Sequence, residues 1–102
     1  MTTYKPRRAT KYLDGAPALV LAIYDNGGKT FDRYTVVYNE PYDERYPRLL
    51  ECLGMSANPF DPQGIGQHSS AMRGSHLGKL IYWKDLPADC QRAVLQDCKP
   101  NS

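Results

Sequence analysis

The sequence of 102 residues predicts a small α+β domain, in which an antiparallel sheet of three or four strands has one C-terminal helix packed on a face and a long Gly-rich loop. Short runs of β-branched and aromatic residues are separated by turn-forming residues, which is typical of strands. Near the C-terminus, apolar residues recur at four-residue spacing, which indicates a helix with one buried stripe. Between these regions, about 20 residues have no apolar periodicity, which is typical of a long loop.

Four runs are predicted as strands. Residues 18–24 (ALVLAIY) are almost all apolar, so this strand should lie inside the sheet. Residues 33–39 (RYTVVYN) have strand composition. Residues 48–55 (RLLECLGM) fit a short strand or one helical turn, and the strand is slightly favoured by the flanking proline and glycine. Residues 79–83 (KLIYW) form the last predicted strand.

Residues 85–98 (DLPADCQRAVLQDC) are predicted to form the helix. Asp85 is placed to cap its first turn, which Pro87 would enter, and Lys99 and Pro100 would end it. The expected buried stripe consists of Leu86, Cys90, Val94, Leu95 and Cys98.

The charge distribution divides the chain into a basic N-terminal arm, residues 1–13, and a single α+β domain, residues 14–102. The arm contains four basic side chains and no acidic one, namely Lys5, Arg7, Arg8 and Lys11. The rest of the chain carries two more acidic than basic side chains. A basic arm of this kind fits either a contact with a nucleic-acid backbone or a solvated chain end.

Several classes of protein are excluded by composition. The longest apolar run, residues 16–24, is too short to span a bilayer, and no apolar signal core follows the basic N-terminus. Three cysteines do not make a disulfide framework. We therefore expect a reduced, cytoplasmic protein that has no contact with a membrane.

The segment DNGGKT, residues 25–30, ends in the letters of a phosphate-binding loop. A Walker A loop, G-x-x-x-x-G-K-[ST], requires a glycine where this chain has Ile23. It also requires a helix after the loop, whereas the next run has strand composition. Asp25 and Asn26 before two glycines favour a turn. The sequence therefore predicts a hairpin loop here and no cofactor.

The glycine-rich segment from residue 56 to residue 78 is predicted to be an ordered loop and the working surface, because binding residues concentrate on loops that a scaffold holds in place. Its expected anchors are Phe60, Ile65, Met72 and Leu77. Its polar side chains include Gln63, Gln67, His68, Ser69, Ser70, Arg73, Ser75 and His76.

Catalytic and metal sites are weakly supported. His68 precedes Ser69, but no G-x-S-x-G elbow is present and neighbours in sequence rarely form a triad. His68 with His76, and Cys90 with Cys98, are eight residues apart, whereas the ligand pairs of structural zinc sites lie closer together. We expect neither a catalytic residue nor a metal.

A cluster of tyrosines and arginines lies in residues 33–48 and includes Tyr42, Arg45 and Tyr46. Tyrosine and arginine are favoured at protein interfaces and could also stack on single-stranded bases. Four acidic residues in or directly before this segment, Asp32, Glu40, Asp43 and Glu44, weaken the case for nucleic acid. For Tyr34 and Tyr38, packing within the sheet is at least as good an explanation.

The stretches DNGGKTFDRYTVV, GMSANPFDPQGIGQH, HLGK and DLPADCQRAV, in this order, resemble a group of small uncharacterised proteins from bacteriophages and other mobile elements. The resemblance covers roughly residues 19–95 and implies a phage or plasmid gene expressed in a bacterial cytoplasm. It implies no established activity.

From these observations we expect a small non-catalytic interaction protein that binds and inhibits a host or defence complex. The predicted binding residues are Tyr42, Arg45, Tyr46, Gln63, Gln67, His68, Arg73, His76 and Lys79. The alternative is a nucleic-acid-binding module that uses Lys5, Arg7, Arg8, Lys11, Arg73, Lys79 and Lys84. A small hydrolase that uses the histidines and serines of the loop is the third hypothesis.

Overall fold

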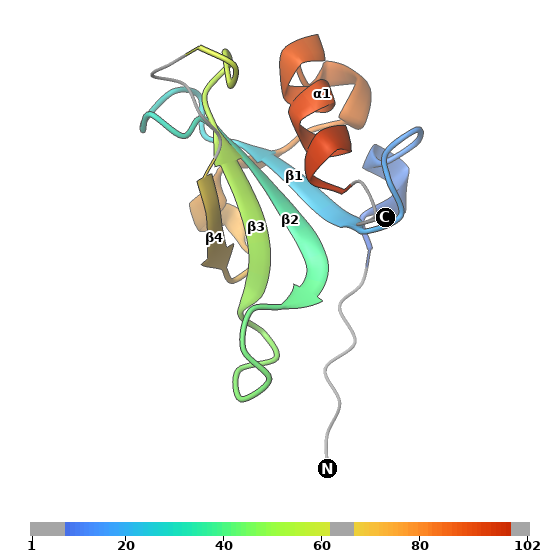
Figure 1. Cartoon of the computed structure of the whole chain (residues 1–102), viewed down its shortest axis with the longest axis vertical. Helices are drawn as coiled ribbons and strands as arrows, with labels where there is room; N and C mark the ends of the chain where they lie inside the picture. Colours follow the sequence, from blue (N-terminus) through green and yellow to red (C-terminus); the bar gives the residue numbers. More distant parts are fainter. Residues whose placement is uncertain (1–7, 62–66, 99–102) are drawn as a thin grey trace.

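One antiparallel sheet with a single helix on one face forms the framework of the protein (Figure 1). The computed structural model describes residues 8–61 and 67–98, and for residues 67–69 it describes the backbone alone. The strand order is β4-β3-β2-β1-β5. The elements are η1 (Thr10–Tyr12), β1 (Val20–Asp25), β2 (Tyr34–Pro41), β3 (Leu50–Met55), β4 (Gln67–Ala71), η2 (Ser75–Leu77), β5 (Lys79–Leu80), η3 (Trp83–Asp85) and α1 (Ala88–Asp97), where η is a 3₁₀ helix.

The α+β class and the C-terminal helix are confirmed, but the predicted number of strands is too low because the sheet has five. The additional strand is β4, which lies inside the segment that was expected to be one continuous loop. Its sequence, QHSSA, has no apolar alternation by which a strand could be recognised. β4 is an edge strand that pairs with β3 from Gly54↔Gln67 to Leu50↔Ala71.

β1 has neighbours on both sides and is buried on both faces, as its apolar sequence predicts. A shift in its register with β2 lies between Val20 and Ala22. Because of this bulge, Leu21 and Ala22 both belong to the cluster on one face, while Val20 and Ile23 belong to the cluster on the other. β1 thereby contributes side chains to the hydrophobic cores on both faces of the sheet.

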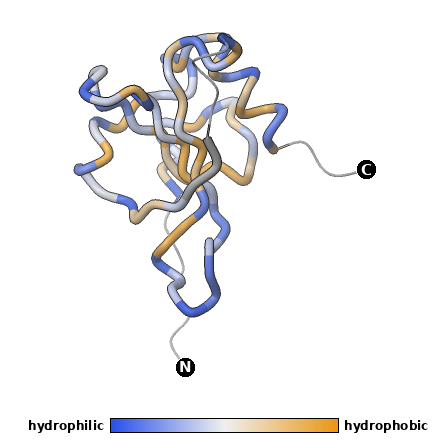
Figure 2. The backbone as a smooth tube through the Cα atoms, turned by 60° about the vertical axis from the view of Figure 1, so that its left-hand side comes forward, coloured by the Kyte–Doolittle hydropathy of each residue, from blue (hydrophilic) through white to orange (hydrophobic). Residues whose placement is uncertain are grey.

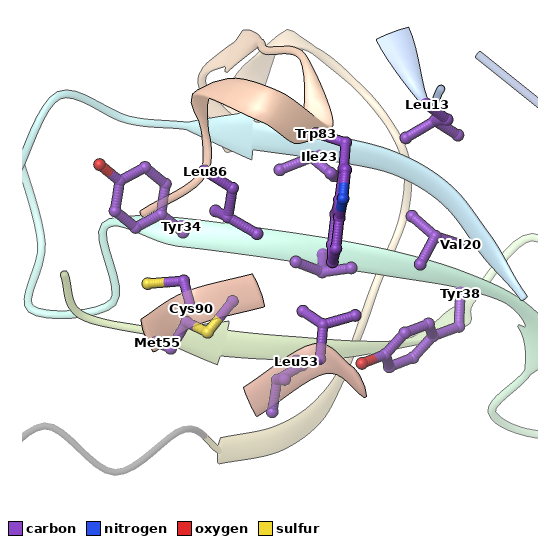
Figure 3. Packing of buried hydrophobic residues seen from close by; sticks show 12 residues of the cluster. Leu13, Val20, Ile23, Tyr34, Tyr38, Leu53, Met55, Trp83, Leu86 and Cys90 are labelled. Carbon is purple, nitrogen blue, oxygen red and sulfur yellow. The ribbon is translucent and has the colours of Figure 1, made fainter. Parts of the chain in front are cut away.

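The larger core lies between the sheet and α1. Figure 3 shows its side chains converging from the strands, from Trp83 of η3 and from α1. Cys90 and Val94 of α1 are completely buried, as predicted, and they belong to the same hydrophobic cluster as Tyr34 and Tyr38, which pack the sheet. Leu95 is 52% exposed, so its predicted place in the buried stripe is wrong. Position 95 is one residue past Val94, which is about 100° further around the helix.

The smaller core lies on the opposite face and contains Leu21, Tyr24, Val37, Leu50 and Cys52. Because β4 and β5 are the two edge strands, the connection between them passes from one edge of the sheet to the other. Leu77, in this connection, and Leu80, in β5, pack against the smaller core. Figure 2 shows that the hydrophobic residues concentrate along the strands of the sheet, which α1 covers on one face and the β4–β5 connection covers on the other.

The start of α1 differs from the prediction. Asp85 is not its cap but the last residue of η3, and the strand predicted for residues 79–83 ends at Leu80. The Asp85 and Leu86 amides close tight turns onto Tyr82 and Trp83, so the helix begins only after Pro87. The Pro87 carbonyl accepts the first helical bond, from the Gln91 amide at 2.9 Å.

The described part of the predicted basic arm, residues 8–13, packs against the rest of the chain. The Arg8 guanidinium donates to the carbonyls of Val20 and Pro17, at 2.9 Å and 3.2 Å. Leu13, which follows η1, is buried in the larger core. Among the described residues, no helix is long and apolar enough to cross a membrane.

Candidate binding surfaces

The predicted binding residues are distributed over separate parts of the surface. Tyr42, Arg45 and Tyr46 lie in the loop between β2 and β3, whereas His76 lies in η2 and Lys79 begins β5. Arg73 is half-buried in the connection after β4. Gln67 and His68 belong to β4, where their backbones pair with Gly54 and Leu53, and Gln63 lies outside the described residues.

The loop between β2 and β3 forms one side of a predominantly apolar groove of about 440 Å³. Met72, from the connection after β4, lies on the other side. Tyr42, Tyr46 and Met72 are 58%, 59% and 52% exposed, and they are three of the six large hydrophobic side chains that the described surface exposes. The groove is lined by Arg45, Tyr46, Pro47, Arg48, Leu49 and Met72. We call it the hairpin groove.

Hydrogen bonds within the chain order this loop. The Tyr42 amide donates to the Leu49 carbonyl at 2.8 Å, and the amides of Tyr46 and Leu49 close two further turns. The Asp43 carboxylate receives the Arg45 guanidinium at 2.7 Å and the Arg45 amide at 2.9 Å, which hold the pKa of Asp43 below its ordinary value. The Arg45 guanidinium also lies 5.7 Å from the centre of the Tyr46 ring. A loop held in this way loses little conformational freedom on binding a partner.

A second pocket, of about 520 Å³, is lined by polar residues and glycines and lies where the tip of the β1–β2 hairpin meets η2 and β5. It brings the predicted residues His76 and Lys79 next to Lys29 and Asp25, which sequence reasoning assigned to a solvated turn. Its lining residues are Asp25, Asn26, Gly27, Lys29, Ser75, His76, Gly78 and Lys79. We call it the tip pocket.

The GGKT letters belong to a hairpin loop, as predicted, because β1 and β2 pair as antiparallel neighbours around it. Asn26 organises the loop. Its side-chain oxygen accepts the amides of Gly28 and Lys29 at 2.8 and 3.0 Å, and its side-chain nitrogen donates to the Thr30 hydroxyl at 2.8 Å. The Gly27 amide donates to the Asp25 carboxylate at 2.8 Å. The amides that a Walker loop would offer to a phosphate are therefore bonded within the loop itself.

The basic residues of the nucleic-acid alternative that the structure describes are divided between separate parts of the surface. Lys11 and Lys84 come together in a third pocket of about 240 Å³, which also contains Asp14. Two tyrosines complete it, Tyr12 and Tyr82, whose ring centres are 4.7 Å apart. Lys79 lies in the tip pocket instead, and Lys5 and Arg7 lie outside the described residues.

The hydrolase hypothesis concerned His68, Ser69 and His76. The first two are consecutive residues of β4, while His76 belongs to η2, at the far end of the crossing connection. Among the side chains that the structure describes, which do not include that of His68, no group of three or more histidine, cysteine or acidic residues is arranged to hold a metal ion. Cys90 instead packs in the larger core, where its thiol donates to the Ser56 carbonyl at 3.3 Å.

Three features of these surfaces were missed from sequence. Pro47, Leu49 and Met72 line the hairpin groove, and Met72, an expected anchor of the loop, is 52% exposed. Phe60, another expected anchor, is exposed beneath the Arg92 guanidinium, 4.6 Å from the ring centre. Lys29 belongs to the tip pocket. No local signal marks these residues, because each pocket joins segments that are distant in the chain.

Comparison of the chain with protein-family models, with curated proteins and with solved structures found no match.

Proposed function

We propose that this chain is a non-catalytic binding protein that docks onto a partner protein through the hairpin groove. The observation that carries the proposal is the gathering of Tyr46 and Met72, both more than half exposed, around one apolar groove whose loop is already ordered. The partner would insert an apolar side chain into the groove, and Arg45 and Arg48 would form its polar rim.

The resemblance to proteins of phages and mobile elements suggests the setting. A bacterial host or defence complex is the partner that we propose, and inhibition of that complex would be the biological effect. The site of action would then be the bacterial cytoplasm.

Site-specific photo-crosslinking tests this proposal. A photoreactive phenylalanine analogue is placed at Tyr46, and separately at Phe31, which is 62% exposed in the β1–β2 loop and serves as the matched control. In bacterial cells, position 46 should capture a protein band that survives nuclease treatment, and position 31 should not. Equal capture at both positions, or capture of nucleic acid alone, would contradict docking through the hairpin groove.

Affinity for the captured partner supplies the second measurement. Tyr46→Ala should weaken binding by more than about 1 kcal/mol, which is about fivefold, because central aromatic anchors carry most of the energy of an interface. Phe31→Ala should leave the affinity unchanged. Both side chains are exposed, so neither change should affect folding.

The nucleic-acid alternative is supported by a different observation, the meeting of Lys11 and Lys84 beside two tyrosines. Asp14 in the same pocket reduces its positive charge, and each lysine lies over a tyrosine ring, at 5.8 Å for Lys11 and 5.3 Å for Lys84. The rings are therefore partly covered on the side where a base would stack. We rank this function second.

A further inference from the structure

The tip pocket contains two lysines that form no ion pair with an acidic side chain in the described part of the chain. Lys29 lies in the β1–β2 loop and Lys79 begins β5, and both are exposed. Among the described residues, neither ammonium group has a carboxylate partner. Two uncompensated positive charges therefore face a pocket whose other side chains include His76 and Ser75.

Lys79 has no acidic partner among the described residues because the carboxylate beside it, on the neighbouring strand β1, is bonded to an arginine. Lys79 is the cross-strand neighbour of Asp25, which would be the natural acidic partner. Both oxygens of the Asp25 carboxylate instead receive the Arg33 guanidinium, at 2.8 and 3.1 Å. A planar guanidinium fork matches a carboxylate better than an ammonium does, so Arg33 occupies Asp25 and leaves Lys79 unpaired.

The walls of the pocket are held at a fixed separation. Gly78 has a φ of +118°, and a Cβ atom at this position would lie 2.4 Å from the Asp25 carbonyl oxygen. Only glycine allows this close approach of η2 and β5 to the hairpin. The hydrogen bonds of Asn26 fix the other wall, which carries Lys29. The two lysines are therefore presented by ordered backbone on opposite sides.

We propose that the tip pocket binds the phosphate group of a small phosphorylated molecule. Lys29 and Lys79 would supply the charge that a phosphate dianion requires, and Ser75 and His76 would donate hydrogen bonds. A pocket of about 520 Å³ has the size of a small-molecule site and could hold a mononucleotide as well as free phosphate. This binding differs from that of a Walker loop, because side chains and not the amides of residues 27–29 would hold the anion.

The proposal is independent of the hairpin groove, which shares no lining residue with the tip pocket. Either one can therefore fail without the other.

Amide chemical shifts measured by NMR, at constant ionic strength, provide the test. Inorganic phosphate, adenosine 5′-monophosphate and adenosine are titrated separately into the full chain. We expect saturable shifts of the amides of residues 25–29 and 75–79 with the two phosphate-bearing ligands and none with adenosine. Equal affinities would assign the site to the phosphate alone, and tighter binding of the nucleotide would assign it to a nucleotide. Absence of saturable shifts with both would overturn the proposal.

Two matched double variants make the test specific. Lys29→Ala with Lys79→Ala should weaken phosphate binding by at least about tenfold. Lys11→Ala with Lys84→Ala removes the same charge from the third pocket and should leave the affinity within about twofold. All four lysines are exposed, so both variants should keep the wild-type melting temperature. Equal weakening by the two variants would show that only the net charge matters and would overturn the proposal.

Discussion

The Arg33 guanidinium donates two hydrogen bonds to the Asp25 carboxylate, at 2.8 Å from Nε and 3.1 Å from Nη2. The side-chain hydrogen bonds from Arg33 lower the pKa of Asp25 below its ordinary value of 3.8, although burial acts in the opposite direction. The pair joins the last residue of β1 to the residue that precedes β2, across the base of the hairpin loop. Because Asp25 is paired with Arg33, the other basic residue beside it, Lys79, has no acidic partner among the described residues.

Asp25→Asn should lower the melting temperature slightly at pH 7 and not at all at low pH. A carboxyl whose pKa is lowered by folding stabilises the protein above its unfolded-state pKa, and this contribution is lost as the pH falls through the folded-state pKa. The difference in melting temperature from wild type should therefore be constant well above pH 3.8, the ordinary pKa, and should disappear as the pH falls through the lowered folded-state pKa of Asp25. Calorimetry across this range measures it.

Asp43→Asn is the control for this pH dependence. Asp43 is also paired with an arginine, Arg45, but the two residues are only two positions apart in sequence, so the unfolded chain keeps the two charges close as well. Its effect on the melting temperature should be smaller than that of Asp25→Asn. A difference between wild type and Asp25→Asn that persists at low pH would contradict the assigned role of the ion pair.

Val94→Asp should unfold the protein, whereas Leu95→Asp should not. Val94 is completely buried against the sheet, and Leu95, the next residue, is 52% exposed. An unpaired buried carboxylate costs several kcal/mol, a large part of a total stability of ~5–15 kcal/mol. Circular dichroism at 25 °C should show loss of the fold in the first variant and a near-wild-type melting curve in the second. If Val94→Asp also gave a near-wild-type melting curve, α1 would not be packed in the core as described.

The Cys90 thiol should make the protein less stable at alkaline pH. Burial, with a smaller effect from Asp89, raises the pKa of Cys90 from 9.0 to about 11. The neutral thiol is favoured in the folded state, so its contribution is complete below pH 9 and is lost as the pH rises through 11. Cys90→Ala should cost about 1 kcal/mol at pH 7 and should flatten the decrease in stability between these pH values. Urea unfolding at four pH values measures both effects, and parallel pH profiles would refute the assignment.

Nucleic-acid binding should be weak and independent of the pocket that holds Lys11 and Lys84. If this pocket contacts a phosphate backbone, affinity falls steeply with salt, with a log–log slope near −0.9 per neutralised phosphate of duplex DNA. We expect Lys11→Ala with Lys84→Ala to leave capture of the partner at position 46 unchanged. Tight DNA or RNA binding whose salt slope flattens in this double variant would reverse the ranking of the two functions.

The parts of the fold that follow from local pattern were predictable. β1 and β2 are rich in β-branched residues, and Cys90 and Val94 recur at helical spacing, so the sheet and its helix could be anticipated. β4 could not, because an edge strand needs only its backbone bonds to β3, and its sequence QHSSA carries no apolar pattern.

The two candidate pockets were predictable only in part. Arg45 and Tyr46 were recognised by residue type, and so were His76 and Lys79. Their neighbours were not, because the crossing connection between β4 and β5 decides that Met72 meets the β2–β3 loop and that Lys79 meets the β1–β2 tip. Sequence pattern contains no information about such a crossing.

The pairing of β5 with β1 also has a kinetic consequence. Tyr24 pairs with Leu80, and more than half of the chain lies between them, whereas β1, β2 and β3 each pair with the next strand along the chain. Closing a long loop costs more entropy than forming a hairpin, so the four-stranded meander should form first and β5 should dock last. With only two residues, β5 is also the strand that should separate most readily in the native state. A ligand bound to Lys79 would therefore slow the separation of β5 from β1, which is the last pair of strands to form during folding.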